Sequence, residues 1–99
     1  MPKPDSASRD AFLSQHNDWQ LASDRDAISR QFQFVDFSEA FAFMTRVALL
    51  AEKLDHHPDW SNSYNKVAVT LSTHDAGGVT PLDLEMAKAM EAFASRRSI

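Results

Sequence analysis

The chain has 99 residues, 43% of them hydrophobic and 24% charged, which suits one domain with a single core and is too little for two. Ten Lys and Arg against fourteen Asp and Glu give a formal net charge of −4, so a nucleic-acid-binding protein, which needs a basic surface, is disfavoured. Cysteine is absent, which excludes disulfides, thiolate metal sites and cysteine nucleophiles. The sequence shows neither an apolar run of transmembrane length nor the apolar core of a signal peptide, so we expect a cytoplasmic protein.

The N-terminal part of the chain predicts a tail followed by a helix. Residues 1–5 contain two prolines and charges of opposite sign, typical of a flexible tail, and residues 6–99 are expected to form the one domain. Ser6 is a suitable cap, and apolar residues beyond it recur at helical spacing up to about Gln15. We therefore expect a short helix capped by Ser6.

Two strands are predicted next. The alternation at 19–21 indicates a short strand, and residues 27–34 alternate between an apolar and a polar face. Arg30 lies on the apolar face, so we expect that this face is not shielded from water along its whole length. The apolar positions of this longer strand are Ile28, Phe32 and Phe34.

A long amphipathic helix is predicted in the middle of the chain. Asp36 and Glu39 fit a capping box, and Pro58 should end the helix at Asp55 or His56, because a residue before proline disfavours the α conformation. One apolar stripe should cover the sheet: Phe37, Ala40, Phe41, Met44, Val47, Ala48, Ala51 and Leu54. Periodicity leaves a second stripe open as either a subunit contact or part of a wide core face: Phe43, Val47, Leu50 and Leu54.

The C-terminal part predicts a second strand pair and a last helix. Residues 60–63 and 66–73 have strand patterns, and His74 follows on the polar side of the second strand. Thr80 then caps a helix with proline at its first position and Asp83 at its third. Its buried stripe is expected to contain Leu82, Met86, Met90 (or Ala89) and Phe93, and its C-terminus Arg96 and Arg97.

The predicted order is helix, strand, strand, helix, strand, strand, helix. Strands joined as hairpins imply an antiparallel sheet, and the amphipathic helices each need a sheet face to cover. The sequence therefore predicts a two-layer α+β domain.

Three of the four histidines lie between positions 56 and 74, and histidine clusters suggest proton transfer or metal binding. No zinc spacing such as HExxH is present, and the adjacent His56 and His57 diverge by roughly 100° in a helix, which disfavours a metal site unless carboxylates assist it. A purely structural role at a helix C-terminus stays equally open. The carboxylates that could orient imidazoles for acid–base chemistry are Glu52, Asp55, Asp75 and Asp83.

Three stretches resemble the pterin-4a-carbinolamine dehydratases: Glu52-Lys53-Leu54-Asp55-His56-His57-Pro58-Asp59-Trp60, Tyr64-Asn65-Lys66-Val67 and Leu71-Ser72-Thr73-His74-Asp75. A double histidine followed by Pro-x-Trp, with Thr-His downstream, is a highly specific signature. The resemblance extends over about residues 19–93 and is looser outside them.

The resemblance implies a four-stranded antiparallel sheet with three helices on one side. It implies loss of water from 4a-hydroxytetrahydropterin, a product of pterin-dependent aromatic amino acid hydroxylases, to give quinonoid dihydropterin without a metal or organic cofactor. The implied active-site histidines are His56, His57 and His74, with Glu52 and Asp83 as supporting carboxylates. The implied substrate-binding residues are His56, His57, Pro58, Thr73, His74, Asp75 and, in a less similar segment, Trp19.

This elimination needs one proton delivered to the hydroxyl on C4a and another removed from N5, and imidazoles suit both steps. We expect His56 and His74 to act as acid and base from opposite edges of the pterin, and His57 mainly to bind and orient it. Glu52 and Asp83 would fix the imidazole tautomers.

Animal members of this family assemble as dimers of dimers and double as dimerisation cofactors of a homeodomain transcription factor. The resemblance therefore implies a homodimer or homotetramer through the 37–54 helix and the sheet edges, with Phe43 and Leu50 as candidate contacts. From the acidic charge and the lack of a long apolar run we expect no direct contact with nucleic acid or membrane. Two alternatives stay open. One is a non-enzymatic dimerisation or regulatory partner on the same fold, and the other is catalysis on a different pterin or small heterocyclic carbinolamine.

Overall fold

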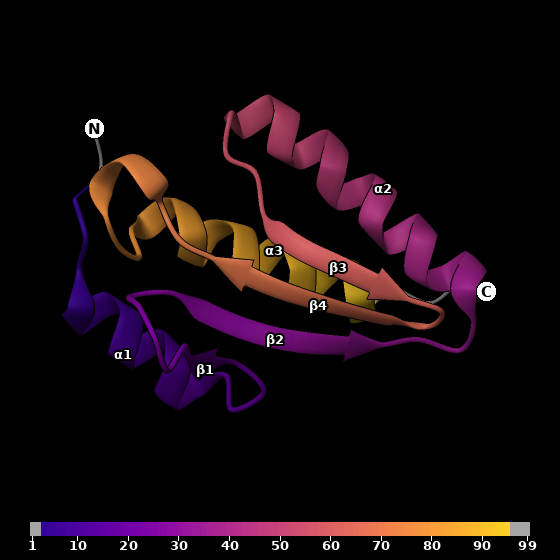
Figure 1. Ribbon diagram of the computed structural model, residues 1–99, viewed down its shortest axis with the longest axis horizontal. Coiled ribbons are helices and arrows are strands. Elements are labelled where there is room, and N and C mark those ends of the chain that lie inside the picture. The colour runs from indigo at the N-terminus through magenta and orange to yellow at the C-terminus, as the bar shows by residue number, and fades with distance from the viewer. Residues whose placement is uncertain (1–2, 96–99) are drawn as a thin grey trace.

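The computed structural model describes residues 3–95 and contains the elements in the predicted order (Figure 1). The predictions for Arg96 and Arg97, and for the first two residues of the tail, lie outside the described residues. No helix within residues 3–95 has the length and apolar character needed to cross a membrane. The elements are α1 Ser6–Gln15, β1 Gln20–Leu21, β2 Ile28–Gln33, α2 Phe37–Leu54, β3 Asp59–Ser63, β4 Lys66–Leu71, a 3₁₀ helix η1 His74–Ala76, and α3 Pro81–Ser95.

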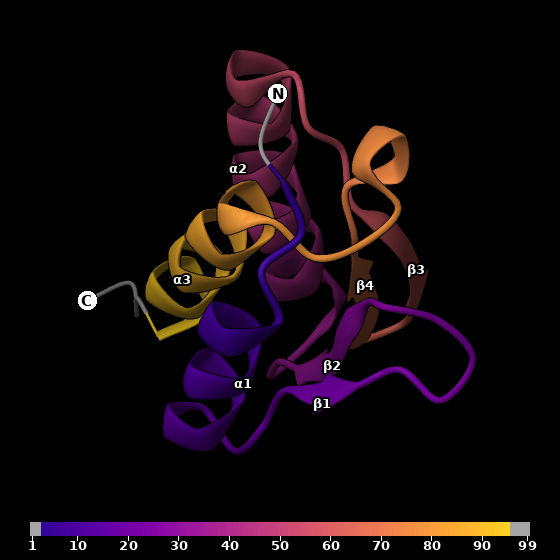
Figure 2. The same ribbon diagram turned by 90° about the vertical axis from the view of Figure 1, so that its left-hand side faces the viewer.

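The four strands form one antiparallel sheet in the order β1-β2-β4-β3. In the two central strands Ile28 lies opposite Leu71 and Phe32 lies opposite Val67, so their inward side chains are in register. Figure 2 shows α1, α2 and α3 on one face of this sheet. The predicted two-layer α+β fold is confirmed.

The side chains between the two layers form one core. Alternate residues of β4, Val67, Val69 and Leu71, are at most 1% exposed, as the period-two pattern predicted. The helix residues buried against the sheet include Ala40, Phe43, Val47 and Ala51 of α2 and Met86, Ala87 and Met90 of α3.

Arg30 is the polar member of the inward face of β2. Its guanidinium lies 4.1 Å from the centre of the Phe32 ring and forms an ion pair with Glu91 of α3. Glu91 also accepts a hydrogen bond from the Trp19 indole at 2.8 Å. The polar residue that interrupts the apolar pattern therefore joins β2 to α3.

Residues from both apolar stripes of α2 are buried, so the second stripe is part of a wide core face, one of the two roles that periodicity left open. Phe43 and Val47 of the second stripe are 3% and 0% exposed, so Phe43 is a core residue and its prediction as a subunit contact is wrong. Leu50 is half-buried. Phe37 and Phe41 of the first stripe are 47% and 55% exposed. Both stripes have helical spacing, and packing against the sheet selects which residues of each stripe are buried.

Asp5 caps α1, where the sequence predicted Ser6. Its carboxylate accepts hydrogen bonds from the Ser8 amide at 3.1 Å and the Ser8 hydroxyl at 2.8 Å. Its own amide donates to the Val79 carbonyl at 3.1 Å. Aspartate can accept both Ser8 protons because each of its two carboxylate oxygens takes one.

The other helices begin as predicted and differ in how they end or pack. The Asp36 carboxylate accepts a hydrogen bond from the Glu39 amide at 2.9 Å. α2 ends at Leu54 because Asp55 adopts the left-handed conformation with φ of 51°, so Pro58 lies beyond the end and does not set it. In α3 the predicted Leu82 and Phe93 are only half-buried, and the buried stripe is Asp83, Leu84, Met86, Ala87 and Met90.

Candidate active site

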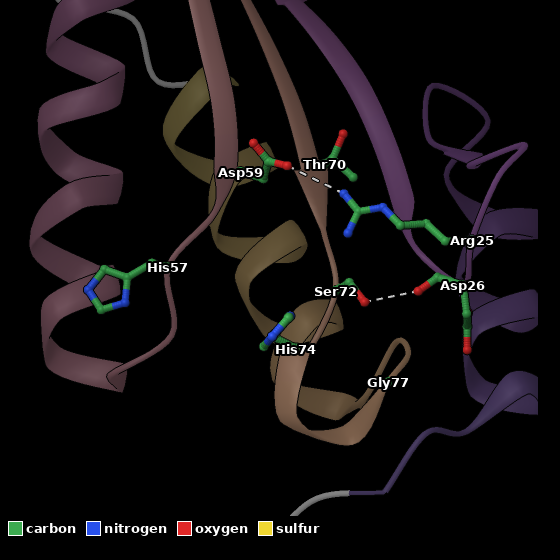
Figure 3. Close-up of a pocket in the computed structure, with 8 residues that line it drawn as sticks. All are labelled: Arg25, Asp26, His57, Asp59, Thr70, Ser72, His74 and Gly77. Atoms are coloured by element: carbon green, nitrogen blue, oxygen red, sulfur yellow. Dashed lines mark hydrogen bonds and ion pairs between the residues drawn. The ribbon is translucent and has the colours of Figure 1, made fainter.

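Two adjoining hollows lie where β4 leaves the sheet, beside the C-terminal end of α2. They share His57, Ser72 and His74. The histidine hollow has a volume of about 380 Å³ and is further lined by Asp55, His56, Thr73, Asp75 and Leu82. The arginine hollow (Figure 3) has a volume of about 320 Å³ and is further lined by Arg25, Asp26, Asp59, Thr70 and Gly77.

The end of α2 places its two adjacent histidines in different surroundings. The left-handed Asp55 turns the chain, and the His56 amide donates to the Ala51 carbonyl at 3.0 Å. His56 is consequently 8% exposed, whereas His57 is exposed. The double histidine therefore supplies one buried and one exposed imidazole.

Asp83 fixes the buried imidazole. His56 Nε2 donates to Asp83 Oδ1 at 2.5 Å, while Asp83 Oδ2 accepts from the Thr73 hydroxyl at 2.8 Å and the Thr80 amide at 2.9 Å. Thr73 has one hydroxyl proton, which Asp83 accepts, so the Thr80 hydroxyl donates to Thr73 Oγ1 at 2.6 Å. Because a carboxylate only accepts, the neutral His56 ring carries its proton on Nε2 and presents a lone pair at Nδ1.

Glu52 holds the exposed imidazole through the same ring atom. His57 Nε2 donates to Glu52 Oε2 at 2.6 Å. The two side chains are 56% and 78% exposed, so water screens this pair and it contributes little to stability. Both adjacent histidines thus use Nε2 for a carboxylate and have Nδ1 available for other contacts.

His74 lines both hollows, which together are called the recess. It begins η1 after Ser72 and Thr73, close to the end of β4 where the sequence placed it. Backbone hydrogen bonds close its loop, from the Thr73 amide to the Gly78 carbonyl and from the Gly77 amide to the Thr73 carbonyl, both at 2.9 Å. Gly77 has φ of 77°, a left-handed conformation that glycine adopts without strain. His74 is exposed, and its ring has no hydrogen-bond partner within residues 3–95.

Most of the predicted site residues meet at this recess. The predicted residues that line the histidine hollow are His56, His57, Thr73, His74 and Asp75. Asp83 supports His56 and Glu52 supports His57. The structure therefore brings together seven of the nine residues that the sequence singled out.

Trp19 and Pro58 line neither hollow. Trp19 is 3% exposed and packs edge-to-face against Phe12 and Phe32, with ring centroids 6.0 Å apart in each pair. Within one chain Trp19 is a core residue, and its contact with a substrate stays a prediction.

Sequence reasoning missed the arginine hollow. One signal was present, because strand alternation puts Thr70 and Ser72 on the same side as His74. Asp59 joins them through the pairing of β3 with β4, in which Asp59 lies opposite Thr70. Arg25 comes from the connection between β1 and β2, and no sequence period predicts that approach.

Comparisons with known proteins agree with the fold. The model of the family described as pterin 4 alpha carbinolamine dehydratase matches residues 2–93. A relative from Mesorhizobium japonicum, provisionally named a pterin-4-alpha-carbinolamine dehydratase, is 64% identical over 83 residues, covering 84% of this chain and 85% of the relative. Another from Bradyrhizobium diazoefficiens, with the same provisional name, is 65% identical over 77 residues, covering 78% of this chain and 77% of the relative.

Two solved structures share the architecture. A transcriptional coactivator/pterin dehydratase from Brucella melitensis is 49% identical, with a TM-score of 0.89 over 94% of this chain and 99% of that one. A pterin dehydratase-like RuBisCO assembly factor of the α-carboxysome is 22% identical, with a TM-score of 0.69 over 83% of this chain and 95% of that one, which shows a common fold. Fold and site thus define a small α+β protein with imidazoles and carboxylates gathered in one recess. The chain belongs to the pterin-4a-carbinolamine dehydratase family.

Proposed function

We propose that the protein catalyses the loss of water from 4a-hydroxytetrahydropterin to give quinonoid dihydropterin. The bond from C4a to the hydroxyl oxygen breaks, the hydroxyl leaves as water after gaining a proton, and N5 loses its proton as the C4a–N5 double bond forms. Each proton transfer is a general acid–base step worth roughly 10²- to 10⁴-fold when well placed. The observation that carries the proposal is a recess with three imidazoles, one of them fixed by a buried carboxylate, in a protein of this family.

His56 and His74 are the proposed acid and base. Both line the histidine hollow and come from different elements, His56 from just past the end of α2 and His74 from the start of η1. Because Nε2 of His56 is bound to Asp83, this histidine would exchange its proton with the substrate through Nδ1. The ring of His74 would act from the other edge of the pterin.

The other site residues are proposed to bind and orient the pterin. His57, held by Glu52, lies at the junction of the two hollows. The volume of the histidine hollow, about 380 Å³, lies within the usual range for small-molecule sites. Imidazoles can move both protons, so the proposal uses neither a metal nor an organic cofactor. The proposed substrate contacts are His56, His57, Pro58, Thr73, His74, Asp75 and Trp19.

The proposed substrate indicates a biological setting. A 4a-hydroxytetrahydropterin is the product that pterin-dependent aromatic amino acid hydroxylases release. The protein would therefore act in the cytoplasm in recycling the tetrahydropterin cofactor of such a hydroxylase.

The surface of the chain supports the proposed assembly into a homodimer or homotetramer. Phe37, Phe41 and Leu49 of α2 are 47%, 55% and 70% exposed, and the rings of the two phenylalanines lie 5.7 Å apart. β3 is an edge strand, with backbone hydrogen-bonding groups free on one side. A second copy that covers α2 or extends the sheet at β3 would remove these features from water.

The proposal is tested by the decay of freshly generated 4a-hydroxytetrahydropterin, followed by ultraviolet absorbance. The native protein should accelerate the decay, and the His56→Ala/His74→Ala double variant should lose the acceleration. His16→Ala is a matched control, because His16 stacks on Phe12 outside the recess and should leave the rate unchanged. A native rate equal to the uncatalysed rate would refute the proposed activity.

A second candidate function is a dimerisation or regulatory partner that acts without catalysis. The exposed apolar side chains of α2 favour it, and the relative from Brucella melitensis is named a transcriptional coactivator as well as a pterin dehydratase. This function predicts that Phe41→Ser impairs binding of a protein partner while the histidine variants do not. The two functions are therefore separable by a variant on the exposed face of α2 and variants at His56 and His74.

A further inference from the structure

His74 differs from the other two histidines of the recess in how it is held. The other two each donate a ring hydrogen bond to a carboxylate. The His74 ring has no hydrogen-bond partner within residues 3–95, so its place in the recess depends on the backbone that carries it. Whatever fixes His74 must therefore hold the loop of residues 73–78.

This loop is closed at its base by its own hydrogen bonds. Thr73 and Gly78 form an isolated antiparallel bridge, in which the Thr73 amide donates to the Gly78 carbonyl at 2.9 Å. The Ala76 and Gly77 amides both donate to the Thr73 carbonyl, at 3.1 Å and 2.9 Å. These hydrogen bonds fix the shape of the loop but join it to no other part of the fold. Its position relative to the sheet depends on contacts at its two ends.

Asp26, in the connection between β1 and β2, contacts both ends of the loop. Just before the loop, the Ser72 hydroxyl donates to the Asp26 carbonyl at 2.9 Å (Figure 3). At its end, the Asp26 carboxylate lies against Gly78, where a β-carbon would overlap Oδ2 and lie 3.0 Å from Cγ. The φ angle of Gly78 is not positive, so the close approach of Asp26, and not the backbone conformation, requires glycine there. One residue outside the loop thus contacts the chain on both sides of His74.

Asp26 is itself anchored to α1 and to the core. Its Oδ1 accepts a hydrogen bond from the Arg9 guanidinium at 2.8 Å, and the Arg9 and Asp26 side chains are 16% and 30% exposed. Water competes less for such a partly buried pair than for one on the open surface. Ala27, the next residue, is 0% exposed. The residue that contacts the loop is therefore fixed through both its side chain and its neighbour.

The chain that leads into α1 contacts the same place. The Asp5 amide donates to the Val79 carbonyl at 3.1 Å, and Pro4 Cβ would lie 3.3 Å from a β-carbon on Gly78. Both residues directly precede the helix that carries Arg9. The segment that follows the loop is thus packed against α1 and its approach as well as against Asp26.

We propose that Asp26 is a positioning residue that holds the His74 imidazole in the recess. It acts through the backbone of the loop, whereas Asp83 and Glu52 bind their imidazoles directly. The inference rests on the proposed function, because His74 is an acid or base only in that reaction. An acid or base must lie within hydrogen-bond reach of the proton that it transfers, so a displaced loop lowers the rate of the reaction.

Steady-state kinetics with 4a-hydroxytetrahydropterin test the catalytic consequence. Asp26→Ala should lower kcat by about tenfold and leave KM within about twofold, because the other proposed substrate contacts stay in place. Asp26→Asn keeps an oxygen that can accept from Arg9 and a similar volume beside Gly78, so it should restore kcat to within about twofold of native. Asp24→Ala removes the same charge at an exposed position of the same connection and should change neither constant. An unchanged kcat for Asp26→Ala would overturn the proposal.

Arg9→Met tests the same link from a residue that lines neither hollow. It removes the anchor of Asp26 and should lower kcat by about fivefold, again with little change in KM. It also replaces Asp26→Ala if that variant fails to fold. Asp10→Ala, which removes the other ion-pair partner of Arg9, is the control and should keep native kcat. A native kcat for Arg9→Met would overturn the proposal, because Asp26 would then act without its anchor.

Gly78→Ala tests the contact between the loop and the Asp26 carboxylate. Its new methyl group would overlap that carboxylate and displace the loop, so the single variant should lower kcat by about tenfold. In the Asp26→Ala background the carboxylate is gone, and adding Gly78→Ala should lower kcat by no more than about a further twofold. Effects that multiply in the double variant would show two independent sites and overturn the proposed contact.

Amide hydrogen exchange follows the loop without turnover. Asp26→Ala should accelerate exchange of the Thr73 amide by about tenfold, and that of the Val67 and Val69 amides in β4 by no more than about threefold. Equal acceleration at all three would show a general loss of stability and overturn the proposal. If the native protein had no dehydratase activity, the proposed function would fail while exchange still decided whether Asp26 holds the loop. Faster exchange at Thr73 together with native kcat would refute the positioning role and leave the function standing.

Discussion

His56 and Asp83, 27 residues apart in the sequence, are joined through Nε2 and Oδ1 at 2.5 Å. Asp83 is 0% exposed, and it also accepts the Thr80 amide at the N-terminus of α3 at 2.9 Å. One carboxylate therefore both caps a helix and orients an imidazole. A substitution of Asp83 should therefore change both the stability of the fold and the proposed catalysis.

Asp83→Ala should lower the free energy of unfolding by about 2–4 kcal/mol, because it leaves the buried Thr80 amide and His56 Nε2 without an acceptor. Urea denaturation measures this. Glu85→Ala, an exposed position on the same helix, is the control and should stay within about 0.5 kcal/mol of the native protein. A loss for Asp83→Ala no larger than that of the control would mean that the network contributes nothing to stability.

Glu52→Gln should lower kcat/KM by no more than about fivefold, because an exposed pair orients His57 with only about 0.2–1 kcal/mol. Its unfolding free energy should not change measurably. Asp83→Asn, which alters the buried pair, should lower kcat/KM by at least about tenfold. Loss of all activity in Glu52→Gln would instead identify His57 as a reacting group.

His57→Ala should raise KM and keep kcat within about tenfold of the native value, because His57 is proposed to bind and orient the substrate. His56→Ala should lower kcat by about 10²-fold or more, as expected for loss of a general acid or base. Steady-state kinetics at saturating substrate distinguish the two variants. If His57→Ala alone abolished turnover, the roles of the histidines would have to be exchanged.

The sequence predicted the faces of β4 and could not predict the rotation of α2. Val67, Val69 and Leu71 alternate with polar residues, and in a strand alternation alone determines which residues share a face. In α2 two stripes had equal helical spacing, and only packing against the sheet buried Phe43 and exposed Phe41. Periodicity describes one element, whereas burial depends on what the element meets.

The candidate site shows the same limit. Its histidines were recognised because they are adjacent or carried by a specific signature. The arginine hollow was not, because Arg25 and Asp59 are 34 residues apart and meet only through the pairing of β3 with β4 and the anchoring of Asp26. When a site is formed by tertiary contacts between surface residues far apart in the sequence, no characteristic spacing in the sequence predicts it.

The pKa of Asp5 is lowered from its ordinary value of 3.8, because the Ser8 amide and hydroxyl donate hydrogen bonds to its carboxylate. A group whose pKa is lower in the folded state stabilises that state above the unfolded pKa, and this stabilisation is lost as the pH falls through the folded value. The free energy of unfolding of the native protein should thus exceed that of Asp5→Ala by its full amount above about pH 5, and this difference should shrink as the carboxylate is protonated. Carboxyl NMR should give a titration midpoint below 3.8. Asp5→Asn, whose amide oxygen can still accept the Ser8 amide, should lack this pH dependence, and a native midpoint at or above 3.8 would contradict the cap.

Phe43→Ala and Phe41→Ala test which face of α2 is the core. Phe43 packs against Phe32 and Phe34 at ring-centroid distances of 4.8 Å and 5.0 Å, so its truncation should lower the unfolding free energy by about 3–5 kcal/mol at any protein concentration. If Phe43→Ala failed to fold, Phe43→Leu should show a smaller loss of the same kind. Phe41→Ala removes an exposed ring and should instead weaken assembly, raising the dissociation constant measured by sedimentation over a dilution series. A concentration-independent loss for Phe41→Ala as large as that for Phe43→Ala would show that both stripes belong to the core, and that α2 has no face free for a second copy.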